Sequence, residues 1–323
     1  MTPYKVWISE VMLQQTVTTA VAPRFVRWLL RFPNVRALAQ ASEQQVLREW
    51  EGLGYYARAR NLHRAAQVIV REYRGRIPAD YRQLLVLPGI GSYTAAAIAS
   101  IAFGQLYPVL DANVRRVMQR VLATAQGQDS DDEAIAAFLR SAISRRRPGD
   151  FNEALMELGQ MVCRPRNPSC GNCPLQTNCG AYRFGSLDER VRPKSGRLIR
   201  RQSVLLIVCC KGKILLEQKQ SGLFRNMWGF PRAALHDAVD AAIAAWAKKH
   251  VDAPLEIIKH LKPVTHFYTR HAEELHPVLA RVSSHRKATT ELRWLMRGEL
   301  EEIPLPSVER RVWMALSARD KRG

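Results

Sequence analysis

Residues Leu87-Pro88-Gly89-Ile90-Gly91 form a turn between two segments whose apolar residues have helical spacing. The two glycines allow a tight turn and let the backbone approach another group with no Cβ in between. The next helix is expected to begin at Ser92, so its first N–H groups point outward and can bind an anion such as a phosphate. An ordinary helix–helix turn is the alternative. The pattern Leu-Pro-Gly-x-Gly before a helix of small residues favours a helix–hairpin–helix clamp on a nucleic-acid backbone.

The charge of the chain points to a polyanionic partner. Its 323 residues are enough for two domains, and they carry a formal net charge of +20 with a sequence pI of about 10.2. Nucleic acid is the commonest partner of such a surface, whereas a merely basic surface or a ribosome-associated protein is the alternative. The sequence shows no apolar run long enough to span a bilayer and no secretory signal. We therefore expect neither a transmembrane helix nor a signal peptide.

Segments with helical periodicity follow one another through the first half of the chain. They lie near residues 5–17, 23–31, 42–51, 56–73, 92–103, 111–124, 131–147 and 151–162. Prolines separate many of them, and no stretch of comparable length shows the alternation expected of a strand. We therefore predict an all-α domain over residues 1–185.

A polar, arginine-rich connector over residues 186–201 follows, and its composition suits a linker that lies along an anion. Residues 203–210 and 214–218 are then apolar or β-branched runs around a Lys-Gly-Lys turn, which predicts a hairpin. Further helices are expected near 237–250 and 306–317, and further strands near 256–261, 264–269 and 277–283. Residues 202–323 are therefore predicted to form an α+β domain.

Two carboxylic residues are candidates for acid–base chemistry. Glu10 has Val6, Trp7 and Leu13 three or four places away on a helix, and desolvation by these neighbours favours the protonated form that a general acid needs. Asp111 lies where a helix begins, so it is either an N-cap or a carboxylate at the mouth of a cleft. Both functions are compatible if one oxygen stays free. A protonated acid and an ionised carboxylate can together break a glycosidic bond.

Four of the six cysteines, Cys163, Cys170, Cys173 and Cys179, lie in one short loop with the spacing Cys-x6-Cys-x2-Cys-x5-Cys. A secreted disulfide framework would spread its pairs over the chain. This pattern instead indicates a reducing compartment and a bound metal, either zinc or an iron–sulfur cluster.

These segments together resemble the endonuclease III superfamily of helix–hairpin–helix DNA glycosylases, and within it the MutY family of adenine glycosylases. The matching stretches are residues 9–16, 52–62, 87–91, 110–114 and 151–159 and the four cysteines. The resemblance covers nearly the whole chain and implies a [4Fe–4S] cluster in the cysteine loop. It also implies that the partner is double-stranded DNA with an A·8-oxoG or A·G mispair, bound by a monomer in the bacterial cytoplasm, at the nucleoid.

The resemblance assigns expected functions to individual residues. Glu10 would protonate adenine N7, and Asp111 would stabilise the oxocarbenium ion, directly or through a transient covalent adduct. Asn113 and Tyr93 would orient the sugar and Asp111. Tyr93 also stands where strand-cleaving relatives carry a Schiff-base lysine, and because a phenol cannot form an imine, a monofunctional hydrolase is implied.

Other positions are expected to contact DNA. Glu153 would touch the extruded adenine, which must leave the duplex because its glycosidic bond cannot be reached inside it. Gln15 and Tyr55 would enter the base stack near the lesion. The hairpin residues that would hold the DNA backbone are Leu87, Gly89 and Gly91.

The second half of the chain resembles the Nudix-like domain that reads 8-oxoguanine in this family. The glutamate-rich helix of a working Nudix hydrolase is missing from residues 237–250, so no pyrophosphatase activity is expected. Tyr268, Thr269 and Arg270 align with the lesion-reading loop, although a strand with aromatic core residues is an equal alternative.

The chain departs from the family pattern at its start. Relatives carry a Trp-Arg pair before the glutamate motif, and here Met1 lies nine residues before Glu10. We expect a fragment that lacks an N-terminal segment, a misassigned start, or a pocket open on one side. Two other functions stay open: a thymine or mismatch glycosylase of the same superfamily, and a non-catalytic iron–sulfur DNA-binding paralogue.

Overall fold

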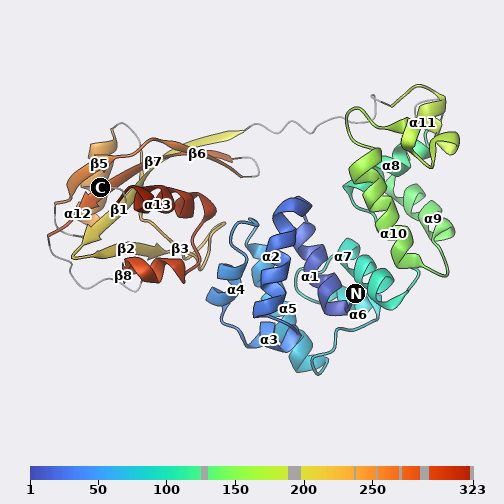
Figure 1. Cartoon of the computed structure of the whole chain (residues 1–323), viewed down its shortest axis with the longest axis horizontal. Helices are drawn as coiled ribbons and strands as arrows, with labels where there is room; N and C mark the ends of the chain where they lie inside the picture. Colours follow the sequence, from blue (N-terminus) through green and yellow to red (C-terminus); the bar gives the residue numbers. More distant parts are fainter. Residues whose placement is uncertain are drawn as a thin grey trace. The chain divides into compact units, whose positions relative to one another are not determined.

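The computed structural model describes residues 1–124, 130–187, 198–235, 238–251, 254–268, 271–283 and 291–320. The chain divides into two compact units (Figure 1). The first comprises Met1–Gln40 and Asn61–Lys194, and the second comprises Ala41–Arg60 and Ser195–Gly323. The second unit therefore takes in a helical segment that precedes it by more than a hundred residues. The predicted domain boundaries at 185 and 202 stay a prediction.

In its described residues, the regular elements of the first unit are all helical. They are α1 (Pro3–Leu13), α2 (Thr18–Arg31), α3 (Val35–Gln40), α6 (Tyr81–Leu85), α7 (Ser92–Ala97), α8 (Ala112–Val121), α9 (Asp132–Ala142), α10 (Pro148–Glu157) and α11 (Gly180–Arg183). The π-helical turns η1 (Ile98–Ala102) and η2 (Leu158–Val162) extend α7 and α10, and the short 3-10 turns η3 (Cys170–Asn172) and η4 (Gln176–Asn178) lie in the cysteine loop. Helix α5 (Ala57–Glu72) begins in the second unit and continues into the first.

Local signals explain where several of these helices begin. Thr2 caps α1, with Pro3 at its first position, and Asp80, Asp111 and Asp131 each accept a bond from a main-chain N–H in the first turn of the helix that follows. These caps were readable from the sequence because they depend only on residues three places apart.

The second unit is built on a mixed sheet of β1 (Ile199–Cys210), β2 (Lys213–Gln218), β3 (Trp228–Gly229), β4 (Arg232–Ala234), β5 (Glu256–His260), β6 (Val264–Tyr268), β7 (His271–Arg281) and β8 (Leu292–Met296). The main strand order is β3-β2-β1-β7-β5, while β4, β6 and β8 pair with β1, β7 and β2. Strands β1 and β7 run parallel, and their register joins Ile199 to His271 and Cys209 to Arg281. The other pairs are antiparallel.

Alternating residues of β1 enter two cores, one on each face of the sheet. Val204, Leu206 and Val208 pack with Trp246 of α12 (Val239–His250). Leu205 and Ile207 pack with a second set that includes residues of α13 (Ser307–Asp320). The two helices therefore cover opposite faces of the sheet. The predicted fold class, an all-α half followed by an α+β half, is confirmed.

Several predicted bounds were wrong. Strand β1 begins at Ile199, inside the predicted connector, and β7 begins at His271 rather than 277. The first four residues of β1 are exposed and carry no apolar alternation. They pair with β7 along the main chain, and Gln202 Nε2 also donates to Glu274 of β7 at 2.7 Å. The connector residues 188–197 lie outside the described residues. Among the described helices, none has the length and apolar character needed to cross a membrane.

Candidate active site

Helix α1 places the Glu10 carboxyl in the interior of the first unit. The helix packs against α2, α7 and η1, and both Val6 and Trp7 are buried beside Glu10, which is only 8% exposed. Leu13 was expected to help desolvate it, but this side chain is 36% exposed. Two of the three expected neighbours are therefore buried with Glu10, and α1 packs against elements that local sequence did not identify.

Glu10 is held by Tyr93 of α7, whose hydroxyl donates a 2.7 Å hydrogen bond to Glu10 Oε2. The same hydroxyl lies 3.1 Å from the Met156 sulfur. Burial raises the pKa of the Glu10 carboxyl; the Tyr93 bond opposes this, and the charges of Glu153 and Asp111 add to it. Burial also raises the pKa of Tyr93, so the phenol stays protonated and acts as the donor. Tyr93 was expected to orient Asp111, but its hydrogen bond goes to Glu10.

Asp111 caps a helix, as one of the two expectations had it, and one of its oxygens is outside the cap. Its Oδ1 accepts a 2.7 Å bond from the Val114 N–H and caps α8, while Oδ2 accepts a 3.0 Å bond from Asn113 Nδ2. A carboxylate oxygen has two lone pairs, so Oδ2 keeps capacity for another partner. The side chain is half-buried, and its charge acts on Glu10. The Asp111 charge therefore contributes to the raised pKa of Glu10.

Asn152 holds the extended residues that lead into Asp111. This buried side chain accepts from the Val109 N–H at 3.1 Å and donates to the Tyr107 carbonyl at 2.9 Å and to Ser100 Oγ at 2.8 Å. It therefore ties the extended residues before α8 to η1. Asn152 was not predicted as a site residue, since nothing local distinguishes it from an exposed helical asparagine.

Arg116 links Asn113 to the cysteine loop. Its Nη2 donates to Asn113 Oδ1 at 3.0 Å and to the Gly159 carbonyl at 2.6 Å, and its Nε donates to the Cys163 carbonyl at 2.9 Å. A Cβ on Gly159 would lie 2.7 Å from the Asn113 Cβ, so the glycine allows this close packing. The orientation of Asp111 therefore depends on the base of the cysteine loop.

The four cysteines of the loop line one cavity. Arg120, only 1% exposed, enters the same region and donates to Cys163 Sγ at 3.3 Å and to the Arg164 carbonyl at 2.7 Å. Burial raises the pKa of the Cys170 thiol, and the other three thiols raise it further. In the described part of the chain, no three His, Cys, Asp or Glu side chains converge as the ligands of a single metal ion do.

The residues expected to contact DNA differ in exposure. Gln15, Glu153, Gly89 and Gly91 are exposed, whereas Leu87 is buried in the core. The hairpin thus presents its backbone. Gly89 has a φ of +77°, and a Cβ at this position would collide with the Asn61 side chain. Gln15 also has a left-handed φ of 54°.

Tyr55 lies in the second unit, as part of the segment Ala41–Arg60. Its ring is 40% exposed, and its φ of 47° lies in the left-handed region. The Arg58 guanidinium lies over the Tyr55 ring, 5.6 Å from its centre, which is a cation–π contact.

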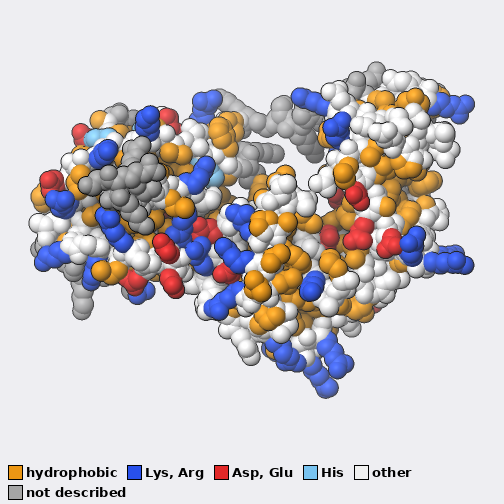
Figure 2. Space-filling model, in the orientation of Figure 1, with side chains coloured by type: hydrophobic (Ala, Val, Ile, Leu, Met, Phe, Trp, Pro, Cys, Tyr) orange, Lys and Arg blue, Asp and Glu red, His pale blue; other side chains and the backbone are white. Residues whose placement is uncertain are grey.

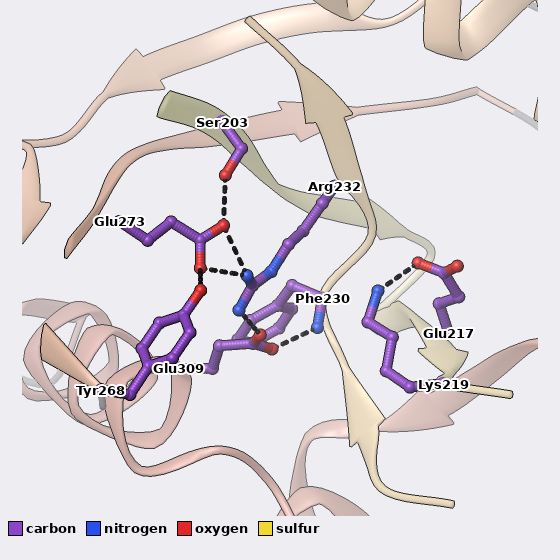
Figure 3. A network of polar contacts seen from close by, with 8 residues as sticks. All are labelled: Ser203, Glu217, Lys219, Phe230, Arg232, Tyr268, Glu273 and Glu309. Carbon is purple, nitrogen blue, oxygen red and sulfur yellow. Dashed lines mark hydrogen bonds and ion pairs between the residues drawn. The ribbon is translucent and has the colours of Figure 1, made fainter. Parts of the chain in front are cut away.

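The described part of the lesion-reading candidate is anchored in a buried polar network of the second unit (Figure 3). The Tyr268 hydroxyl donates to Glu273 at 2.9 Å, and this carboxylate also accepts from Ser203 and from Arg232. Arg232 in turn donates to the fully buried Glu309 at 2.7 Å. Burial raises the pKa of Tyr268 to about 12. Thr269 and Arg270 lie outside the described residues.

Comparison with known proteins gives matches in both halves of the chain. Residues 8–143 match the HhH-GPD superfamily of base excision DNA repair proteins, and residues 203–315 match the NUDIX domain. The adenine DNA glycosylase of Buchnera aphidicola subsp. Schizaphis graminum is 30% identical over 291 residues, which are 87% of this chain and 81% of that protein.

Two further comparisons cover smaller shares. The mouse adenine DNA glycosylase is 46% identical over 184 residues, which are 55% of this chain and 35% of the mouse protein, so the match spans about a third of that relative. Among solved structures, a thermostable thymine-DNA glycosylase is 27% identical with a TM-score of 0.53, covering 56% of this chain and 85% of that chain.

Proposed function

This chain belongs to the adenine DNA glycosylase family, and from that premise we propose that it hydrolyses the N-glycosidic bond of adenine paired with 8-oxoguanine or guanine. The observation that carries the proposal is the buried Glu10 carboxyl, whose pKa is raised by burial and also by the charge of the half-buried Asp111. A carboxyl with a raised pKa together with a second carboxyl group is the arrangement that glycosidic bond cleavage needs.

The proposed reaction uses Glu10 as the acid and Asp111 as the carboxylate that stabilises the sugar. Glu10 donates its proton to adenine N7, and the electron pair of the C1′–N9 bond moves into the base, which leaves as neutral adenine. The positive charge left on the sugar ring is stabilised by the Asp111 carboxylate, which Asn113 holds at 3.0 Å. Water then adds to C1′, and its proton goes to the Glu10 carboxylate, which restores the starting state.

Tyr93 supports a monofunctional reaction. Its hydroxyl is committed to Glu10 at 2.7 Å, and a phenol forms no imine with the sugar. The expected product is therefore an abasic site in an intact strand.

A [4Fe–4S] cluster is the cofactor that we propose for the cysteine loop. A tetrahedral zinc ion binds each sulfur at about 2.3 Å, and the described thiols do not gather around one point in that way. A four-iron cluster binds each thiolate through a different iron, which suits four thiols around a cavity. When bound, the cluster would cross-link residues 163–179; Arg116 and Arg120 contact the main chain at that loop.

DNA is the partner that the charge supports. Lys and Arg side chains are scattered over the visible face of both units in Figure 2, in keeping with the net charge of +20. We propose that Gln15 and Tyr55 enter the base stack, that Glu153 contacts the extruded adenine, and that the exposed Gly89 and Gly91 contact phosphate. Tyr268 and its two neighbours are the proposed readers of 8-oxoguanine.

The test is release of adenine from an oligonucleotide duplex with one A·8-oxoG pair, followed by alkaline cleavage of the abasic site. Parent protein should generate the product, and Glu10→Gln should abolish it. A matched duplex with a T·G pair addresses the thymine glycosylase alternative. Preferential loss of thymine, or adenine release that persists in Glu10→Gln, would contradict the proposal.

A further inference from the structure

Residues 41–60 are fastened to the rest of the second unit by a set of polar contacts. The carboxylate of Glu51 accepts from Arg310 Nε at 2.8 Å and from Arg310 Nη2 at 3.1 Å, and the two side chains are 9% and 12% exposed. Arg310 also donates to the Ile303 carbonyl at 2.8 Å and to the Leu300 carbonyl at 2.5 Å. A planar guanidinium with all of these acceptors is fixed in one orientation, which a lysine could not reproduce.

A second group of contacts holds the helix that precedes Glu51, α4 (Glu43–Glu49). Gln44 donates to the Asn226 carbonyl at 2.6 Å, and Asn226 Nδ2 donates back to Glu43 at 2.8 Å. Arg48 Nε donates to the Glu301 carbonyl at 2.7 Å. We call these contacts, together with the Glu51–Arg310 pair, the clasp.

The clasp ends where a strained loop begins. Gly52, Gly54 and Tyr55 have φ values of 88°, 68° and 47°, so three residues of four are left-handed. Only glycine adopts this region without cost, and Tyr55 needs support from its surroundings. Some of that support is local: Trp50 Nε1 donates to the Gly54 carbonyl at 3.0 Å, and Arg58 donates to the Leu53 carbonyl at 3.0 Å.

The loop is anchored again on its other side. The ring of Tyr56, buried next to the exposed Tyr55, contacts Phe224 edge-on at 6.1 Å between centroids. Phe224 in turn contacts Tyr268 edge-on at 6.3 Å. Phe224 therefore contacts both Tyr56, which follows Tyr55, and Tyr268, which we propose to contact 8-oxoguanine.

We propose that Arg310 and Phe224 are positioning residues for Tyr55: they hold the two ends of the loop 52–55 so that its aromatic ring is presented for insertion into the base stack. This inference rests on the proposed function. In this proposal, the Nudix-like unit helps to open the duplex and also recognises the lesion. It also explains why Ala41–Arg60 belongs to the second unit.

The experiment measures base unstacking in the full-length chain. A duplex with A opposite 8-oxoG and 2-aminopurine beside the 8-oxoG is titrated with protein that carries Glu10→Gln, so that no base is released during the measurement. Insertion of Tyr55 should raise the 2-aminopurine fluorescence. Arg310→Gln should reduce this rise by roughly threefold to tenfold at saturating protein, a size typical of coupled sites.

The control removes another ion pair of the same unit. Lys219→Gln breaks a 2.5 Å pair with Glu217 (Figure 3), and should leave the fluorescence rise unchanged. Phe224→Leu keeps the site apolar and serves as the second variant if Arg310→Gln fails to fold, as judged by circular dichroism. Each variant is also made in a Tyr55→Ala background, where the positioning residues should have no further effect on the fluorescence.

The outcomes separate the two proposals. The positioning proposal would be overturned if Arg310→Gln and Phe224→Leu gave the full fluorescence rise. It would also be overturned if their losses added to the loss caused by Tyr55→Ala. In either case, adenine release by the parent would still support the proposed function. Absence of adenine release by the parent would contradict the proposed function itself, whatever the fluorescence shows.

Discussion

Tyr93 donates a 2.7 Å hydrogen bond to Glu10, and 83 residues of sequence separate the two. The bond links α7 to the Glu10 carboxyl of α1, and α1 packs against α2, α7 and η1. The bond stabilises the ionised form of Glu10, whereas burial favours the protonated form, and burial is the larger of the two effects. Tyr93 thus limits how far the pKa of the acid is raised.

Replacing Tyr93 with Phe tests this balance. Because the hydroxyl lowers the pKa of Glu10, its loss should raise that pKa further. Base release needs protonated Glu10, so the rate should fall with rising pH in both proteins, and at a higher pH in Tyr93→Phe. Single-turnover rates from about pH 4, close to the usual pKa of Glu, up to about pH 9 measure it. A fall that moves to lower pH would contradict the assignment of Glu10 as the acid.

Glu10→Gln should change how stability depends on pH. The carboxyl has a raised pKa in the folded state, so above about pH 4.3, the unfolded value, the folded chain holds a proton that the unfolded chain has lost. The folded parent therefore loses stability as pH rises toward the folded pKa, and Glu10→Gln removes this loss.

Urea unfolding at several pH values measures that difference. The stability of Glu10→Gln relative to the parent should increase with pH until Glu10 ionises in the folded state. A substitution at an exposed carboxyl, Glu157→Gln, is the control and should follow the parent. A relative stability that is constant with pH would show that Glu10 does not carry a raised pKa.

Arg116→Gln should slow base release more than it weakens DNA binding. The change removes charged donors to Asn113, Gly159 and Cys163, and so releases the amide that holds Asp111. We expect a cost of about 2 kcal/mol in unfolding free energy and a roughly tenfold slower single-turnover rate, because a looser carboxylate stabilises the sugar cation less.

The neighbouring Arg115 provides the matched control for that experiment. Its 2.6 Å pair with Asp132 is exposed, at 39% and 59% for the two side chains. Exposed pairs contribute about 0–1 kcal/mol, so Arg115→Gln should change neither rate nor stability much. Equal effects of the two substitutions would argue against a special link between Arg116 and Asp111.

Cys173→Ser should lower the iron content of the purified protein, whereas Cys209→Ser should not. Cys173 lines the cavity with the three other loop cysteines, while Cys209 lies half-buried at the end of β1. Iron and sulfide per chain, together with visible absorbance, are the measurements. Equal iron in Cys173→Ser and the parent would contradict the proposed cluster. Stoichiometric zinc in the parent would show that the loop binds zinc instead.

Much of the fold could be read from neighbouring residues. Helical periodicity, the caps at Asp80, Asp111 and Asp131, and the Lys211-Gly212 turn between β1 and β2 all depend on groups within about four residues of one another. The fold class was confirmed for this reason. The strand ends were not predictable, since the exposed start of β1 is defined only by its parallel partner β7.

The candidate site divides in the same way. Residue types and spacing were enough to single out Glu10, Asp111 and the four cysteines, because carboxyl and thiol chemistry is a property of the side chain itself. Their functional roles stay predictions until the experiments above are done. The bond from Tyr93 to Glu10 rather than to Asp111 depended on how α1 and α7 pack.

Folding alone determined which distant groups support that chemistry. Arg116, Asn152, Glu51 and Arg310 look like ordinary polar residues in the chain, and their partners lie between 3 and 259 residues away. A buried polar group must find hydrogen-bond partners wherever packing places it. Local pattern therefore supplied the reactive groups, while long-range packing set their orientation, their protonation and the unit to which the Tyr55 loop belongs.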